Sequence, residues 1–224
     1  MLNQTVMAEL FVNPKFGYLN VEDAELAASN GVYQSLLKSA FKGLRYPETD
    51  SLDQLEELTY LQRRMAQAHS DDIKNAQKAD AYLPEFIAHQ FEGYGRVKVQ
   101  SVKAVLQAIK PTLMALKEKY NRARPHQLAF YLDQQMHPFK SLTAHNPSFP
   151  GGHSCQVRFA ALVFSELYPS MTRKLENTQA FVSDSRLILG LHYPSDNEAG
   201  FDVADACFES VLTQKFLSQL TTVL

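Results

Sequence analysis

Apolar residues recur at helical spacing along most of the chain, and no segment shows the strict alternation of a half-buried strand. In the N-terminal half this pattern predicts four helical segments. Ser51 followed by Gln54 resembles a capping box at the start of the segment 52–65. Asn30–Gly31 interrupts the segment 21–44, and Pro84 interrupts the segment 71–92. The segments cover residues 21–44, 52–65, 71–92 and 97–122.

The C-terminal half continues the helical pattern on either side of a loop rich in Pro, Ser, Asn and Gly at residues 138–152. A connection of this length inside a compact domain is usually functional or mobile. Residues 1–20 are predicted to be an irregular lead-in, and no linker or repeat divides the chain. We therefore expect one all-α domain over residues 1–224, whose remaining helices cover residues 127–136, 153–168, 170–189 and 195–220.

The boundary between the last two predicted helices carries the most distinctive chemistry. Gly190 and Pro194 predict a helix that ends near Leu189, a turn, and a new helix that starts near Pro194. The turn carries His192, and Asp196 in the first turn of the new helix would lie close enough to orient its imidazole. With Arg186 nearby, such a histidine suits attack on phosphorus. The alternative is a solvated arginine and a helix-capping aspartate.

Composition narrows the classes of partner. The chain of 224 residues carries 22 Lys and Arg against 24 Asp and Glu, so neither nucleic acid nor an anionic membrane surface is indicated. Apolar runs are too short for a membrane span. Because no signal-peptide pattern is present, we expect a cytoplasmic protein, or a periplasmic one if a signal peptide has been removed.

Two further groups of residues suggest an anion site. Lys117 and Arg124 are seven residues apart and would project from one helix face, with Pro125 placing Arg124 at the helix exit. Lys119 and Arg122 would point elsewhere, as solvated charges. The alternative for Lys117 and Arg124 is also a solvated face.

Pro150-Gly151-Gly152-His153 precedes the next predicted helix. Glycines at a helix start let backbone N–H groups approach an anion, and His153 could pass a proton to a leaving group bound there. The alternative is an ordinary first-turn histidine.

Together, Lys117-(six residues)-Arg124-Pro125, Pro150-Gly151-Gly152-His153 and Ser185-Arg186-(five residues)-His192-(three residues)-Asp196 resemble a three-part signature. It is that of the type-2 phosphatidic acid phosphatase and vanadium haloperoxidase superfamily. Of its members, this chain is closest in type to the soluble bacterial acid phosphatases. The resemblance covers residues 117–196, and it has one departure: Gly151 stands where the family usually has serine.

The resemblance implies a helical bundle with the site at one end, and a phosphomonoesterase that forms a phosphohistidine. His192 would be the nucleophile, Asp196 would fix its tautomer, and His153 would protonate the leaving oxygen. Five residues would hold the phosphoryl oxygens of a small phosphorylated substrate: Lys117, Arg124, Gly151, Gly152 and Arg186. No metal or other cofactor is expected, since no carboxylate cluster could hold Mg²⁺, and vanadate is expected to inhibit.

Two alternatives share the same anion pocket. One is a haloperoxidase with vanadate as its cofactor, held by His192. The other is a phosphate-binding relative with little turnover, because Gly151 lacks the hydroxyl that the family serine would donate. The sequence indicates neither the physiological substrate nor the oligomeric state.

Overall fold

A computed structural model describes residues 15–93 and 97–220. The regular secondary structure in these ranges is helical, without a β-strand, and Lys15 and Arg122 form an isolated β-bridge. The predicted all-α class is therefore confirmed for the described part, while residues 1–14 of the predicted lead-in lie outside it. Two short 3₁₀ helices accompany the α-helices, at Gln34–Lys38 and Pro169–Met171. The α-helices are α2 Val21–Ala28, α3 Leu52–Ala66, α4 Ser70–Ala81, α5 Leu83–His89, α6 Val99–Tyr120, α7 Pro125–Tyr131, α8 Gly152–Leu167, α9 Thr172–Ile188, α10 Pro194–Glu209 and α11 Val211–Leu220.

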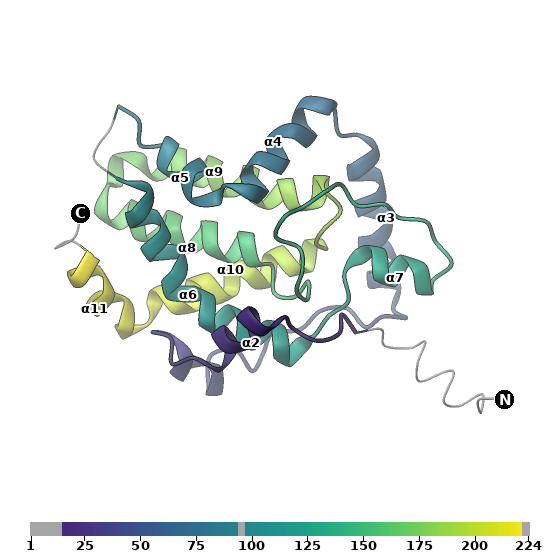
Figure 1. Cartoon of the computed structure of the whole chain (residues 1–224), viewed down its shortest axis with the longest axis horizontal. Coiled ribbons are helices and arrows are strands. Elements are labelled where there is room, and N and C mark those ends of the chain that lie inside the picture. The colour runs from purple at the N-terminus through teal and green to yellow at the C-terminus, as the bar shows by residue number, and fades with distance from the viewer. Residues whose placement is uncertain (1–14, 94–96, 221–224) are drawn as a thin grey trace.

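Helix α8 lies at the centre of the fold and packs against α6, α9 and α10, while α2 covers α6 and α4 covers α9 (Figure 1). The N-terminal end of α8 meets α10 unusually closely. A Cβ at Gly200 would lie 2.6 Å from the Gly151 carbonyl oxygen, so only glycine fits there. This contact brings the start of α8 to the start of α10, where the candidate site lies.

Two helix ends fix the direction of the chain around the site. Helix α6 ends at Tyr120, and the following Asn121 is left-handed with φ 48°. Arg124 then caps α7, which has Pro125 in its first turn. Helix α9 ends at Ile188, and Gly190 follows with φ 71°. Helix α10 starts at Pro194, so the predicted helix–turn–helix around His192 is confirmed.

Other predicted boundaries were wrong. The segment 195–220 is two helices, because Ser210 is extended (φ −70°, ψ 146°) and its hydroxyl accepts the Leu212 N–H. The break in 71–92 falls at Tyr82, since Pro84 needs no N–H partner in the first turn of α5. Helix α7 is shorter than predicted, and residues 21–44 hold only α2 and a 3₁₀ turn. No helix in the described ranges is both long and apolar enough to cross a bilayer.

Candidate active site

A cavity of about 240 Å³ lies where α6, α8 and the C-terminal end of α9 converge on the loop before α8. Six of the residues singled out from the sequence line it: Lys117, Arg124, Gly152, His153, Arg186 and His192. Asp196 lies behind His192 and is fully buried. The structure therefore brings together residues from three separated stretches of the chain.

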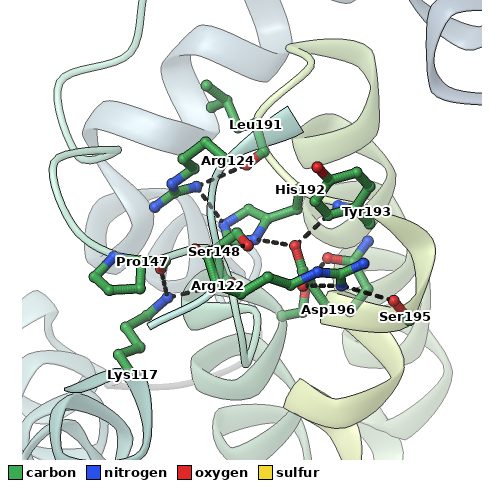
Figure 2. A network of polar contacts seen from close by, with 12 residues as sticks. Lys117, Arg122, Arg124, Pro147, Ser148, Leu191, His192, Tyr193, Ser195 and Asp196 are labelled. Atoms are coloured by element: carbon green, nitrogen blue, oxygen red, sulfur yellow. Dashed lines mark hydrogen bonds and ion pairs between the residues drawn. The ribbon is translucent and has the colours of Figure 1, made fainter. Parts of the chain in front are cut away.

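His192 lies between a cation and a carboxylate, as Figure 2 shows. Its Nε2 is 3.0 Å from Arg124 Nη1, and its Nδ1 is 3.3 Å from Asp196 Oδ2. Because a guanidinium has no acceptor, Nε2 accepts that bond and Nδ1 carries the proton donated to Asp196. Burial and then Arg124 hold the pKa of His192 well below its usual value. The ring is thus neutral, with its Nε2 lone pair toward the cations.

Arg122 is buried, so its predicted role as a solvated charge was wrong. Its Nη1 donates to Asp196 Oδ1 at 2.6 Å, and its Nη2 donates to Gln54 Oε1 at 2.7 Å and Glu57 Oε2 at 3.0 Å. The left-handed Asn121 ends α6, so helical periodicity no longer sets the direction of this side chain. Lys119 is exposed, as predicted.

The carboxylate of Asp196 is stabilised by this arginine. Burial alone would raise the pKa of Asp196, but Arg122 and His192 together hold it well below its usual value. The Tyr193 N–H also donates to Asp196 Oδ2, at 2.9 Å. The carboxylate that holds His192 is therefore ionised and fixed from three directions.

Asp80, at the end of α4, is a site residue that the sequence analysis missed. Its Oδ1 accepts from Arg186 Nη1 and from Thr143 Oγ1, and its backbone oxygen lies 3.0 Å from His153 Nε2. Its Oδ2 accepts from the loop residues Ser141 and Leu142, at 2.9 and 3.0 Å. Asp80 therefore orients Arg186 and ties the loop before α8 to the site.

The same loop orients the other two cations. Lys117 Nζ donates to the Pro147 carbonyl at 2.5 Å, and Arg124 Nε donates to the Asn146 carbonyl at 2.9 Å (Figure 2 shows the first). Burial and neighbouring cations lower the pKa of both, that of Arg124 to about 9. A bound anion would favour the charged form of each.

His153 is neutral in this arrangement. Burial and then Arg186 lower its pKa to about 3, although Asp80 acts in the opposite direction. A phosphate dianion among these groups would raise that pKa, and only then could His153 donate a proton.

Gly151 differs from its predicted role. Its N–H donates to the Asp196 carbonyl at 2.7 Å, and Gly151 does not line the cavity. A Cβ on Gly151 would lie 2.7 Å from that carbonyl oxygen, whereas a Cβ on Gly152 would meet Lys117 Cε at an ordinary 3.5 Å. Gly152, at the start of α8, is thus the glycine that faces the anion site.

The described residues contain no group of three or more His, Cys, Asp or Glu side chains that could hold a metal ion. Within the ranges given above, the cavity offers cations to an anionic ligand and no metal centre.

The chain was compared with known protein families, solved structures and curated proteins. A family model described as the PAP2 superfamily matches residues 102–217, which is more than half of the chain and includes all three motifs. Among solved structures, the chain is similar to one described as the first transmembrane PAP2 type phosphatidylglycerolphosphate phosphatase from Bacillus subtilis. That match has a TM-score of 0.49 and 15% identity, and it covers 92% of this chain and 98% of the other. No curated protein sequence matches.

Proposed function

This chain belongs to the PAP2 superfamily, and we propose that it is a metal-independent phosphomonoesterase that works through a phosphohistidine intermediate. Membership of the superfamily supports phosphatase-type activity. The proposal of a phosphohistidine rests on the tautomer and orientation of His192. Its Nδ1–H donates to Asp196, while its Nε2 lone pair faces Arg124. A neutral imidazole aimed at the cations that would hold a phosphoryl group is poised to attack phosphorus.

In the first step, Nε2 of His192 forms a bond to phosphorus as the bond to the ester oxygen breaks. The proton that the leaving oxygen needs comes from His153, whose pKa rises once the substrate dianion is bound. Asp196 stabilises the positive charge that develops on the imidazole, because its carboxylate accepts the Nδ1–H bond.

In the second step, a water molecule attacks the phosphorus of phosphohistidine, and His153 takes the proton of that water. The P–N bond breaks, its electron pair returns to Nε2, and inorganic phosphate leaves. Lys117, Arg124 and Arg186 neutralise charge on the phosphoryl oxygens throughout, which is the main demand of phosphoryl transfer. The fixed cations support a reaction without a metal ion.

The test is hydrolysis of an aryl phosphate with and without a chelator. We expect turnover to survive the chelator, to be blocked by vanadate, and to fall at least ~10³-fold in His192→Ala. His126→Ala is the matched control, because His126 is exposed and does not line the cavity. Normal turnover in His192→Ala would refute the mechanism, and peroxide-dependent halogenation with vanadate but without hydrolysis would favour a haloperoxidase.

A further inference from the structure

The cavity extends beyond the residues assigned to the phosphoryl group, along one face of α6. Lys103, Lys110 and Lys117 all line it and are spaced seven residues apart, nearly two full helical turns. Leu106 and Leu113 line it between these lysines. The part of the cavity beyond Lys117 is therefore lined by both cationic and apolar side chains, and the proposed reaction does not use them.

More cationic than anionic side chains line the cavity, and only some of the cations form ion pairs. The lining cations are Lys103, Lys110, Lys117, Arg124 and Arg186, and the lining carboxylates are Asp23 and Asp80. Lys103 pairs with Glu85 at 3.2 Å, and Arg186 pairs with Asp80.

Asp23 is also occupied, because it accepts from Asn146 at 3.1 Å and lies 3.5 Å from His145. In the described ranges this leaves Lys117, Arg124 and Lys110 without a carboxylate partner. The first two belong to the phosphoryl site. Lys110, which is half-buried, has no assigned anion.

We infer that Lys110 binds a second anionic group of the substrate, so that the preferred ligand is a phosphate monoester with another phosphate or carboxylate several bonds away. The inference rests on the proposed function of the inner end of the cavity. Seven helical residues separate Lys110 from Lys117 by about 10.5 Å along α6. Two phosphoryl groups joined through one atom would both stay at the inner end, so a diphosphate would not need Lys110.

Two neutral polar side chains of the cavity could add to such binding. Gln107 lies about one helical turn before Lys110 on α6, and Gln156 on α8 also lines the cavity; both could hydrogen-bond to an anionic oxygen. Leu106 and Leu113 would contact an apolar linker between the two anionic groups. Lys110 is thus a specificity-determining residue, and His192 remains the group that reacts.

Binding of non-hydrolysable phosphonates tests the inference without turnover. We expect calorimetry to show butane-1,4-diyl bisphosphonate binding about tenfold more tightly than butylphosphonate, as expected for one added charge-assisted contact. Lys110→Met should reduce this ratio to about one to two, and Lys110→Glu should reverse the preference. Lys119→Met, an exposed lysine on the same helix, should leave the ratio unchanged.

Methylenebisphosphonate, with both phosphorus atoms on one carbon, provides the spacing control. Its affinity relative to methylphosphonate should be the same in wild type and Lys110→Met. Equal affinity of the two butane ligands in wild type, an unchanged ratio in Lys110→Met, or a methylenebisphosphonate preference that depends on Lys110 would overturn the inference.

Turnover of butyl phosphate and butane-1,4-diyl bisphosphate separates this inference from the proposed function. The ratio of their kcat/KM values should follow the binding ratio in each variant. If Lys110 controls phosphonate binding but neither ester is hydrolysed, the second anion site stands and the proposed phosphatase activity fails. If both esters are hydrolysed through His192 with a ratio that Lys110→Met leaves unchanged, the activity stands and the second site fails.

Discussion

Arg122 and His192 contact opposite oxygens of one buried carboxylate: Arg122 Nη1 lies 2.6 Å from Asp196 Oδ1, and His192 Nδ1 lies 3.3 Å from Oδ2. Arg122 is in turn held by Gln54 and Glu57 of α3. Helix α3 lies outside the residues matched by the family model, 102–217. The N-terminal half therefore contributes directly to the position of the histidine.

Replacing Arg122 by methionine should destabilise the protein strongly and slow turnover. The change leaves the fully buried Asp196 without its main cationic partner, and breaking such a pair costs about 3–5 kcal/mol. The carboxylate would then hold His192 less well, so kcat should fall more than KM changes. Urea unfolding and steady-state kinetics measure the two effects.

The matched control is Arg158→Met, which removes an arginine–aspartate pair that is partly exposed. Such a pair contributes about 0–1 kcal/mol. Equal losses of stability in the two variants would contradict the role assigned to Arg122.

Glu57→Gln tests the link from α3 to the site. Glu57 accepts from Arg122 and from both the N–H and the hydroxyl of Ser195, beside Asp196. The neutral amide of glutamine has only one acceptor oxygen, so at least one of these hydrogen bonds to a charged group is lost. Because Arg122 and Ser195 then hold Asp196 less firmly, we expect kcat to fall about tenfold. The neighbouring Glu56→Gln, at an exposed position, should have no effect, and equal kinetics in the two variants would refute the link.

Sequence reasoning was successful where the signal is local. Gly190 and Pro194 mark two helix ends within five residues, and Asp196 follows His192 by only four residues, so their geometry could be predicted. Asp80 and Glu57 carry no such signal. Asp80 meets Arg186 across 106 residues of sequence, and Glu57 meets Arg122 across 65, so only tertiary packing brings each pair together.

Arg122 shows a different limit. Helical periodicity predicts its direction only while the helix continues, and the left-handed Asn121 ends α6 just before it. Gly151 shows a third limit, because a residue can occupy a motif position while its N–H donates to a backbone carbonyl instead of the ligand.

The two adjacent glycines should respond differently to alanine. Gly151→Ala should destabilise the protein by about 1–3 kcal/mol, since its Cβ would lie 2.7 Å from the Asp196 carbonyl oxygen. Gly152→Ala places its Cβ in ordinary contact with Lys117 Cε at 3.5 Å, so the fold should tolerate it while vanadate inhibition weakens. Urea unfolding and vanadate titration distinguish them, and equal stability of both variants would contradict the geometry. By the same argument, Gly151→Ser should destabilise the protein and restore no phosphate donor.

Stability should decrease with acid, because two buried histidines are neutral. The pKa of His153 is about 3 in the folded protein against 6.5 unfolded, and that of His192 is also lowered. Between these two values for His153 the unfolded chain binds more protons, so His153 lowers stability by about 1.4 kcal/mol per pH unit as pH falls from 6.5 to about 3. His192 acts in the same direction. Asp80 and Asp196, whose pKa values are lowered, lose their contribution as pH falls below about 3.8.

Urea unfolding between pH 7 and pH 4 measures this slope. His153→Gln should reduce it, because the amide does not titrate, and saturating sulfate should reduce it in wild type by raising the pKa of His153. A slope that neither change affects would show that His153 does not respond to an anion in the cavity.

The central claim is that His192 carries the phosphoryl group, and trapping the intermediate tests it most directly. In His153→Gln, an aryl phosphate whose leaving group needs no acid should still phosphorylate the enzyme, while hydrolysis of the intermediate slows. Alkaline quenching and peptide mass spectrometry should then find phosphate on His192. Continued turnover without a phosphorylated His192 peptide, or with phosphate on another residue, would contradict the account.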